Sequence, residues 1–188
     1  MRVIAGSARS LPLKTVPSDA VRPTTDKTKE TLFNILMPRI GDCRFLDLFS
    51  GSGAIGIEAL SRGAAFCALV EKDRTAQKVI EENLAFTHLK EGAELVRGDV
   101  LFALKKLEGK GAFDIIFMDP PYRKDLEERV LRELKDSSLA DEDTIIVVEA
   151  ANETGFDYLD SLGYVCYKEK RYKTNKHLFI KRNHGKED

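Results

Sequence analysis

Long hydrophobic runs are absent from this chain of 188 residues. No stretch of about 18 consecutive apolar residues occurs, so the sequence predicts no membrane-spanning helix. The first residues, MRVIAGSARSLPLK, have no long apolar centre, so we expect no signal peptide and a cytoplasmic location. Repeats, low-complexity tracts and linkers are absent as well. The length therefore predicts one domain with a full hydrophobic core.

Cysteine is scarce. The chain has three, Cys43, Cys67 and Cys166, and none forms a CxxC pair with another. An odd number of isolated cysteines indicates neither a disulfide framework nor a zinc site, so we expect no metal. Cys67 lies in an apolar run and is predicted to be a buried thiol.

Net charge is nearly absent, at −1, but the charged residues are unevenly distributed. Residues 1–29 contain six basic and two acidic side chains, and residues 165–182 contain seven basic and one acidic. The middle of the chain is therefore acidic, and a polyanionic partner would contact the two ends. The alternative is that both basic runs are solvated strand faces.

Strand and helix patterns alternate from residue 44 onward. We expect strands at residues 44–49, 66–71, 94–97, 113–118, 144–149, 164–172 and 177–181, and helices at residues 54–62, 74–89, 100–107, 125–135 and 156–162. Runs such as residues 145–148 are apolar throughout, which is typical of strands buried on both faces. The pattern predicts an α/β fold with a doubly wound, mostly parallel, seven-stranded Rossmann-like sheet and an antiparallel pair at one edge.

Residues 1–22 are expected to form an extension that contacts a polyanion, attached to a main domain at residues 23–183. Short alternating segments at residues 2–4 and 11–16 predict an N-terminal hairpin within this extension.

A helix is expected to follow the extension. Thr25 or Asp26 can cap its N-terminus, and Pro38 and Gly41 are predicted to end it.

The stretch FLDLFSGSGAIG, residues 45–56, reads as a strand, a glycine turn and the start of a helix. Gly51, Gly53 and Gly56 match the GxGxxG pattern. Glycines let a ligand approach bare backbone, and the free N–H groups of the helix point toward it. A tight turn without a ligand would explain this pattern equally well.

Carboxylates follow five successive strands of the predicted sheet. They are Asp47, Glu71, Asp99, Asp119 and Glu149. Ligands of such sheets bind outside the carboxyl ends of the strands. Asp73 and Asp99 can be explained as helix caps, whereas Asp47 and Glu71 do not directly precede a helix.

The position of Glu71 relative to Gly51 suits a carboxylate that accepts hydrogen bonds from ribose hydroxyls, since such acids lie about 20 residues beyond the glycine turn. Both a nicotinamide dinucleotide and S-adenosylmethionine fit this spacing. A dinucleotide would bring a pyrophosphate to the helix, whereas S-adenosylmethionine brings an ammonium and a sulfonium. Asp47, close to the turn, favours the cationic ligand.

The tetrad Asp119-Pro120-Pro121-Tyr122 follows a buried strand. The prolines have no N–H, so the backbone offers only carbonyl acceptors, and an ionised Asp also only accepts. Such a site suits a planar NH₂ donor, on which the ring of Tyr122 can stack. A Pro-Pro turn without a ligand is the alternative.

The motifs DLFSGSG, VEKD, GDV and DPPY, in this order, resemble class I S-adenosylmethionine-dependent methyltransferases that modify exocyclic amines. RVIAGS near the N-terminus, RPTTDKTKETLFNIL (residues 22–36) and GIEALSRGA (residues 56–64) resemble the bacterial ribosomal RNA small subunit methyltransferase D family. The resemblance covers nearly the whole chain. It implies methylation of the N2 amine of a guanine in 16S ribosomal RNA, with S-adenosylmethionine as cofactor.

The resemblance also implies a role for each matching residue. The cofactor would be held by Asp47, Ser50, Gly51, Ser52 and Gly53 at its methionine end, Glu71 with Lys72 at the ribose, Asp99 and Val100 at the adenine, and Thr24 and Thr25 from the N-terminal side. The target guanine would be held by Asp119, Pro120, Pro121 and Tyr122. Separately from the resemblance, the basic charge of the N-terminal extension leads us to expect that RNA phosphates are contacted by Arg2, Arg9, Lys14 and Arg22. The expected partner is ribosomal RNA, free or in an assembling subunit, and we expect a monomer.

Four other functions are compatible with parts of the sequence. The DPPY tetrad also fits DNA adenine-N6 methylation, and protein glutamine methylation usually has Asn at its first position. An NAD-dependent oxidoreductase would share the glycine turn but gives no reason for the tetrad. A non-catalytic RNA-binding module would explain only the basic ends of the chain.

Overall fold

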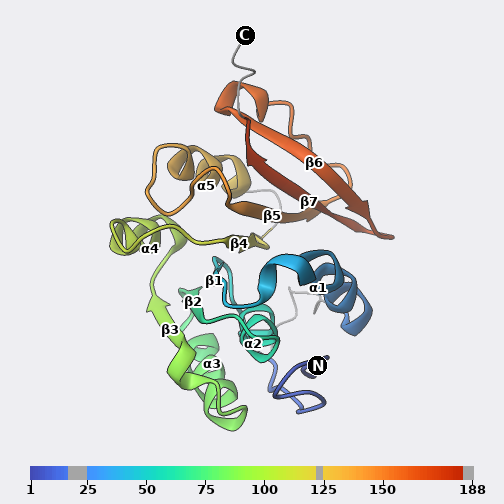
Figure 1. Ribbon diagram of the computed structural model, residues 1–188, viewed down its shortest axis with the longest axis vertical. Helices are drawn as coiled ribbons and strands as arrows, with labels where there is room; N and C mark the ends of the chain where they lie inside the picture. Colours follow the sequence, from blue (N-terminus) through green and yellow to red (C-terminus); the bar gives the residue numbers. More distant parts are fainter. Residues whose placement is uncertain (17–24, 122–124, 184–188) are drawn as a thin grey trace.

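The computed structural model describes residues 1–16, 25–121 and 125–183. A seven-stranded sheet in the order β3-β2-β1-β4-β5-β7-β6 runs through the molecule (Figure 1). Its strands are β1 (Arg44–Asp47), β2 (Phe66–Glu71), β3 (Ala93–Arg97), β4 (Ile115–Met118), β5 (Ile145–Ala151), β6 (Tyr164–Arg171) and β7 (Asn175–Arg182). β1 to β5 pair in parallel, and β7 pairs antiparallel with both β5 and β6. The predicted fold is confirmed.

Helices cover both faces of the sheet. One hydrophobic cluster joins the sheet to α1 (Asp26–Ile40), α2 (Ala54–Ser61) and α3 (Arg74–Phe86). A second joins it to α4 (Val100–Leu107) and α5 (Leu126–Lys135). Two short 3₁₀ helices, η1 (Lys90–Gly92) and η2 (Asp160–Leu162), complete the described elements.

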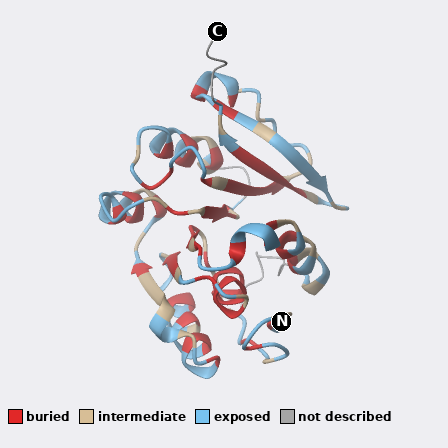
Figure 2. Ribbon diagram, viewed as in Figure 1, coloured by how far each residue is buried: buried red, intermediate tan, exposed pale blue. Residues whose placement is uncertain are grey.

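Alternate residues of the central strands point into opposite clusters. In β4, Ile116 and Met118 belong to the α4–α5 cluster, whereas Ile115 and Phe117 belong to the α1–α3 cluster. Because both faces are covered, these strands are apolar throughout. Figure 2 shows the resulting buried layer through the middle of the molecule.

The helix caps follow the sequence closely. Thr25 accepts a hydrogen bond from the Thr28 N–H and caps α1, and Asp73 and Asp99 cap α3 and α4. The prediction that Pro38 helps to end the first helix is wrong, because α1 continues to Ile40. Ile40 is buried in the core, and this burial favours continuation of the helix beyond the proline.

The helix expected at residues 156–162 is reduced to η2. The N–H of Leu159 donates to the Phe156 carbonyl, and that of Leu162 to the Leu159 carbonyl, which are three-residue spacings. So short a helix has little intrinsic stability, and packing of Phe156 against the core favours a tighter turn.

The N-terminal hairpin is not confirmed as a pair of strands. Within the described part of this segment, one isolated antiparallel bridge joins Arg2 to Pro12. The N–H groups of Ile4 and Ala5 instead donate to the carboxylate of Glu58, at 2.8 and 3.1 Å. Backbone hydrogen bonds do join Val3 to Leu11 and Leu13 to Met1, but the described segment is assigned only the single bridge and is anchored to α2 through Glu58. The proposed boundary near residue 22 lies outside the described residues.

None of the helices within the described ranges is long and apolar enough to cross a bilayer.

Candidate active site

The carboxyl ends of β1, β2, β4 and β5 meet at one edge of the sheet, because these strands are parallel. β1 lies at the centre, with β2 on one side and β4 on the other. The chain leaves β1 toward β2 and crosses back to β4, so the strand order reverses here. In doubly wound folds such a switch point is where ligands bind.

Asp47 is the last residue of β1 and is buried. Its Oδ2 accepts a hydrogen bond from the Gly56 N–H at 3.2 Å. Its Oδ1 is buried too and has no hydrogen-bond partner among the described residues. Burial raises the pKa of Asp47 to about 7, and the charge of Glu71 adds to this effect. A buried carboxylate with an open acceptor oxygen fits a cationic ligand group.

The glycine turn is held in place from both sides. The Ser50 N–H donates to the Val70 carbonyl at 3.0 Å, and the Ser50 hydroxyl donates to the Asp47 carbonyl at 2.9 Å. The Ser52 carbonyl accepts from Nδ2 of Asn83 at 2.9 Å. Gly51 has φ of 54°, and a Cβ placed there would meet nothing within 4 Å. The turn is thus fixed while its Gly51 backbone stays open to a ligand.

Gly56 serves helix packing rather than the ligand. A Cβ at this position would lie 2.8 Å from both Sγ of Cys67 and Cδ2 of Leu69. The third glycine of the GxGxxG pattern therefore lets α2 approach β2 closely.

Glu71, at the end of β2, is joined directly to the turn. Its Oε2 accepts from the Gly51 N–H at 2.8 Å, and its Oε1 accepts from the Asp73 N–H at 2.8 Å. Each carboxylate oxygen has a second lone pair, so the group can still accept from two ligand hydroxyls. Lys72 beside it is exposed.

Asp99 follows β3 and caps the next helix. Its Oδ1 accepts from the N–H groups of Leu101 and Phe102 at the start of α4, both at 3.1 Å. Its Oδ2 makes no hydrogen bond within the described part of the chain, so the cap leaves one oxygen for a ligand. Val100 is buried beside it, and Phe102 is exposed nearby.

Asp119 follows β4 and is half-buried. Met118 pairs with Val148, so Asp119 and Glu149 are neighbours on adjacent strands. Burial raises the pKa of Asp119 well above its ordinary value, and the charges of Glu149 and then Asp47 raise it further. A carboxylate with a raised pKa is a better proton acceptor near neutral pH.

The rest of the predicted substrate tetrad is only partly described. Pro120 is buried and Pro121 is exposed. Tyr122, Thr24 and Arg22 lie outside the described residues.

Comparison with known proteins identifies relatives over most of the chain. The family described as Conserved hypothetical protein 95 matches residues 1–181. Ribosomal RNA small subunit methyltransferase D of Escherichia coli (strain K12) is 42% identical over 157 residues, covering 82% of this chain and 77% of that protein. The protein of the same name from Haemophilus influenzae is 37% identical over 154 residues, covering 81% and 80%.

This chain belongs to the ribosomal RNA small subunit methyltransferase D family. The solved structure of Escherichia coli yhhF is 36% identical, with a TM-score of 0.83 over 97% of this chain and 98% of that one. The structure of SMU.776 complexed with SAH is 17% identical, with a TM-score of 0.70 over 87% of this chain and 51% of that one, and shows the same fold.

The structure brings some of the site residues inferred from the family resemblance into contact with one another. Hydrogen bonds join the turn at residues 50–53 to Asp47, Glu71 and Asn83, and Asp119 lies within electrostatic range of Asp47. Thr25 makes the contacts of a helix cap.

Two of the N-terminal cations that were predicted to contact phosphates are held in ion pairs within the chain. Arg2 forms an ion pair with Asp26 at 3.0 Å, and Lys14 forms one with Glu82 at 2.7 Å. Arg9 is exposed.

The sequence did not predict the buried polar network around Glu149, beside Asp119. Glu149 accepts from Nδ2 of Asn175 at 2.5 Å and is paired with Nε2 of His177 at 2.8 Å. The other ring nitrogen of His177 lies 3.3 Å from the Tyr172 hydroxyl. A histidine directly before the apolar run LFI (residues 178–180) was the available signal, but only strand register shows that it faces Glu149.

A second missed group anchors the N-terminal segment. Lys29 and Glu58 form a fully buried ion pair at 3.1 Å, and Arg62 donates to Glu58 at 2.7 Å. Burial lowers the pKa of Lys29, and the charge of Glu58 opposes this shift. The signal was a lysine in the apolar stripe of α1, one helical turn before Leu32 and Phe33.

Residues 1–16, 25–121 and 125–183 contain no group of three or more His, Cys, Asp or Glu side chains arranged to hold a metal ion.

Proposed function

We propose that this protein transfers a methyl group from S-adenosylmethionine to the exocyclic N2 amine of a guanine in 16S ribosomal RNA. The open, buried oxygen of Asp47 beside the glycine turn carries the proposal, since it fits a cationic cofactor rather than a pyrophosphate. The names of the relatives and the DPPY tetrad support the reaction and its substrate.

The cofactor would lie along the edge formed by β1, β2 and β3. Asp47 and the Gly51 backbone would hold its amino-acid end, Glu71 its ribose, and the free Oδ2 of Asp99 its adenine amino group. When bound, it supplies a methyl group on a positively charged sulfur. The fold shared with SMU.776, which is complexed with SAH, supports this choice of cofactor.

The substrate amine would be held at the end of β4. The carboxylate of Asp119 and the carbonyl of Pro120 would accept its two N–H bonds, which orients the nitrogen lone pair for methyl transfer. Bringing the base out of its stack costs a few kcal/mol, and stacking on Tyr122 would offset part of that cost.

One proton must leave the nitrogen once its bond to the methyl carbon has formed. Asp119, whose pKa is raised by burial and by the charge of Glu149, would take this proton, either directly or through a water molecule. The raised pKa makes its carboxylate more basic than an exposed aspartate.

Phosphates of the RNA would be contacted by the N-terminal cations Arg2, Arg9, Lys14 and Arg22. The substrate would be ribosomal RNA, free or within an assembling small subunit, bound by one copy of the chain.

The Asp119→Ala variant tests the substrate site. We expect methyl transfer to fall by about a hundredfold or more, because both proton acceptance and positioning are lost. Cofactor affinity, measured by calorimetry, should change little. Asp143→Asn, an exposed acid at the opposite edge of the sheet, serves as the matched control and should keep full activity. A high residual rate in D119A together with an equal loss of cofactor affinity would show that this role is wrong.

Labelled-methyl transfer tests the product. Ribosomal RNA from cells that lack this protein is incubated with labelled cofactor, and the modified base is mapped. We expect label on the N2 of a guanine in the small-subunit RNA. Label on an adenine N6, or transfer only to DNA, would contradict the proposed substrate.

A further inference from the structure

The antiparallel strands β7 and β6 extend the sheet beyond β5 (Figure 1). Strand register places Glu149 of β5 opposite His177 of β7, and His177 opposite Lys170 of β6. Asp119 is the neighbour of Glu149 on the other side. One row of residues therefore runs from Asp119, just after β4, through Glu149 and His177 to Lys170, and is about 15 Å long at the usual strand spacing of about 4.8 Å.

The two faces of β6 differ in how their charges are compensated. Glu169 and Arg171 pair with Leu178 and Lys176 on the face away from the row. Glu169 forms an ion pair with Arg171 at 2.5 Å and lies 3.9 Å from Nζ of Lys176. Glu169, the acidic residue of β6, is therefore paired with cations on the face away from the row.

On the face of β6 that carries the row, two lysines make no ion pair with any described residue. Lys168 and Lys170 pair with Phe179 and His177, so they lie on the same face as Glu149. Both are exposed, and neither forms an ion pair with any residue that the structure describes.

A β-bulge adds an aromatic ring to this face. The register of β6 shifts between Cys166 and Lys168. Tyr167 lies in the bulge, is 44% exposed, and has its ring 6.3 Å from that of Phe179. Nζ of Lys181 lies 5.2 Å from the centre of the Tyr167 ring. Because bulges re-aim side chains, an aromatic ring and three lysines share one face.

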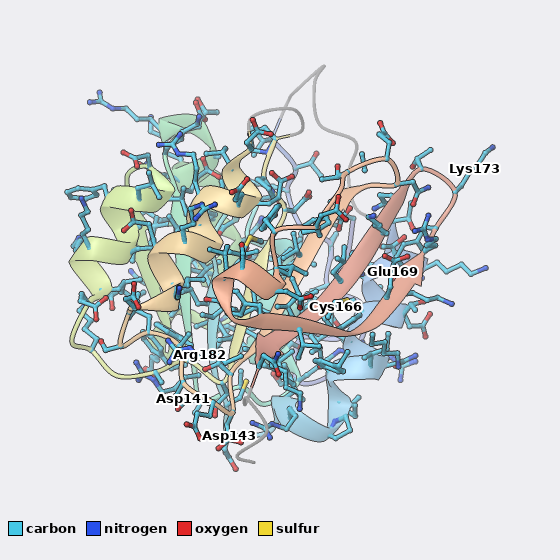
Figure 3. The ribbon with its side chains drawn as sticks, turned by 90° about the horizontal axis from the view of Figure 1, so that it is seen from above. Asp141, Asp143, Cys166, Glu169, Lys173 and Arg182 are labelled. Atoms are coloured by element: carbon cyan, nitrogen blue, oxygen red, sulfur yellow. The ribbon has the colours of Figure 1, made fainter. Side chains whose placement is uncertain are left out.

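The tip of this hairpin lies at the ligand-binding edge of the sheet. Figure 3 shows Lys173, in the β6–β7 turn, on the side of the molecule opposite Asp141 and Asp143, which precede β5. Lysines on an edge strand also discourage association of sheets, but that role needs neither a common face nor an exposed ring.

We propose that Tyr167, Lys168, Lys170 and Lys181, the β6 cationic face, bind the sugar-phosphate backbone of the RNA strand that carries the target base. The inference rests on the proposed function. Cations interleaved with an aromatic ring are typical of surfaces that bind single-stranded nucleic acid. The row from Lys170 to Asp119 is short enough for one RNA strand to contact both ends.

The K168Q/K170Q variant tests this surface. Its matched control, K105Q/K106Q, removes two lysines from the last turn of α4, on the opposite face of the sheet. Affinity for a transcript of small-subunit ribosomal RNA is measured by fluorescence anisotropy at several KCl concentrations. We expect K168Q/K170Q to bind roughly tenfold more weakly at low salt, with its salt slope reduced by about 2.

Measurements of KM, kcat and cofactor affinity distinguish a failure of this inference from a failure of the proposed function. In K168Q/K170Q the KM for RNA should rise, while kcat at saturating RNA and the cofactor Kd stay unchanged. An unchanged affinity and slope, or an equal loss in K105Q/K106Q, would overturn the inference while wild-type methylation persists. Unchanged binding of naked RNA with slower methylation of assembled subunits would assign the face to a ribosomal protein and also overturn it. A wild-type protein that methylates no ribosomal RNA would overturn the proposed function itself.

Discussion

Asp47 is a carboxylate in a place that disfavours its charge. Burial raises its pKa from 3.8 to about 7. Between these two pH values the folded state holds a proton that the unfolded state has released. The free energy of unfolding therefore falls as pH rises through this window, and the loss is complete above about pH 7. A cationic ligand beside Asp47 would stabilise its ionised carboxylate, and this gives a reason for a buried acid at this position.

The Asp47→Asn variant isolates this cost. Asn has nearly the shape of the protonated carboxyl group but does not titrate. Relative to wild type, we expect the free energy of unfolding of D47N to increase by roughly 2–3 kcal/mol between about pH 5 and about pH 8, because only the wild type loses its proton over this range. Urea unfolding at the two pH values gives this difference, and calorimetry should show weak cofactor binding in D47N.

The D143N variant provides the control for pH effects on the rest of the molecule, since Asp143 is exposed. Its stability should follow that of the wild type at both pH values. A D47N protein that parallels the wild type across this pH range and keeps tight cofactor binding would refute this account of Asp47.

Helices and strands could be predicted where residues close together in the sequence determine their bounds. The bounds of β2 and α4 agree with the prediction at both ends, since an apolar run ends at a charged residue in the first and Asp99 caps the second. The predicted N-terminal hairpin is reduced to one bridge because the N–H groups of Ile4 and Ala5 bond to Glu58, which lies far along the chain. No periodicity within the N-terminal segment carries that information.

The site divides in the same way. Asp47 and Glu71 could be found because each directly ends a strand of a parallel sheet, where side chains gather at one edge. His177 and Asn175 could not, because their contact with Glu149 depends on the register of two antiparallel strands that are not consecutive in the chain. The faces of β6 depend on a bulge, which the sequence does not reveal.

Contact between α2 and β2 depends on Gly56. A methyl group there would lie 2.8 Å from atoms of Cys67 and Leu69, both buried. We expect Gly56→Ala to lower the free energy of unfolding by about 1–3 kcal/mol through overpacking. It should also weaken cofactor binding, since Asp47 is bonded to this end of α2.

The matched control is Gly41→Ala. Gly41 has φ of −62° and open space where a Cβ would lie. Alanine fits this conformation, so the free energy of unfolding should rise by about 0.4–1 kcal/mol. Urea unfolding of both variants gives the comparison. Equal effects of the two substitutions would show that contact with β2 is not what requires Gly56.

At the scale of the whole molecule, charge is arranged by function rather than by chain position. The edge of the sheet where we propose that cofactor and substrate bind holds Asp47, Asp119 and Glu149, and these acids suit a cationic cofactor and an amine donor. Lys168 and Lys170, which pair with no acid among the described residues, lie on β6 to one side of these acids. RNA phosphates can thus be held near the edge while the acids stay free of them.

Salt dependence distinguishes the two basic ends of the chain. We expect the RNA affinity of the wild type to fall by about a hundredfold between about 50 and about 200 mM KCl, as for about four phosphate contacts. Removing Arg2 and Lys14 as R2Q/K14Q should reduce the salt slope less than K168Q/K170Q does. Asp26 and Glu82 already compensate those two cations, whereas Lys168 and Lys170 have no such partner among the described residues. A larger loss of slope in R2Q/K14Q would place the main phosphate contacts on the N-terminal segment instead.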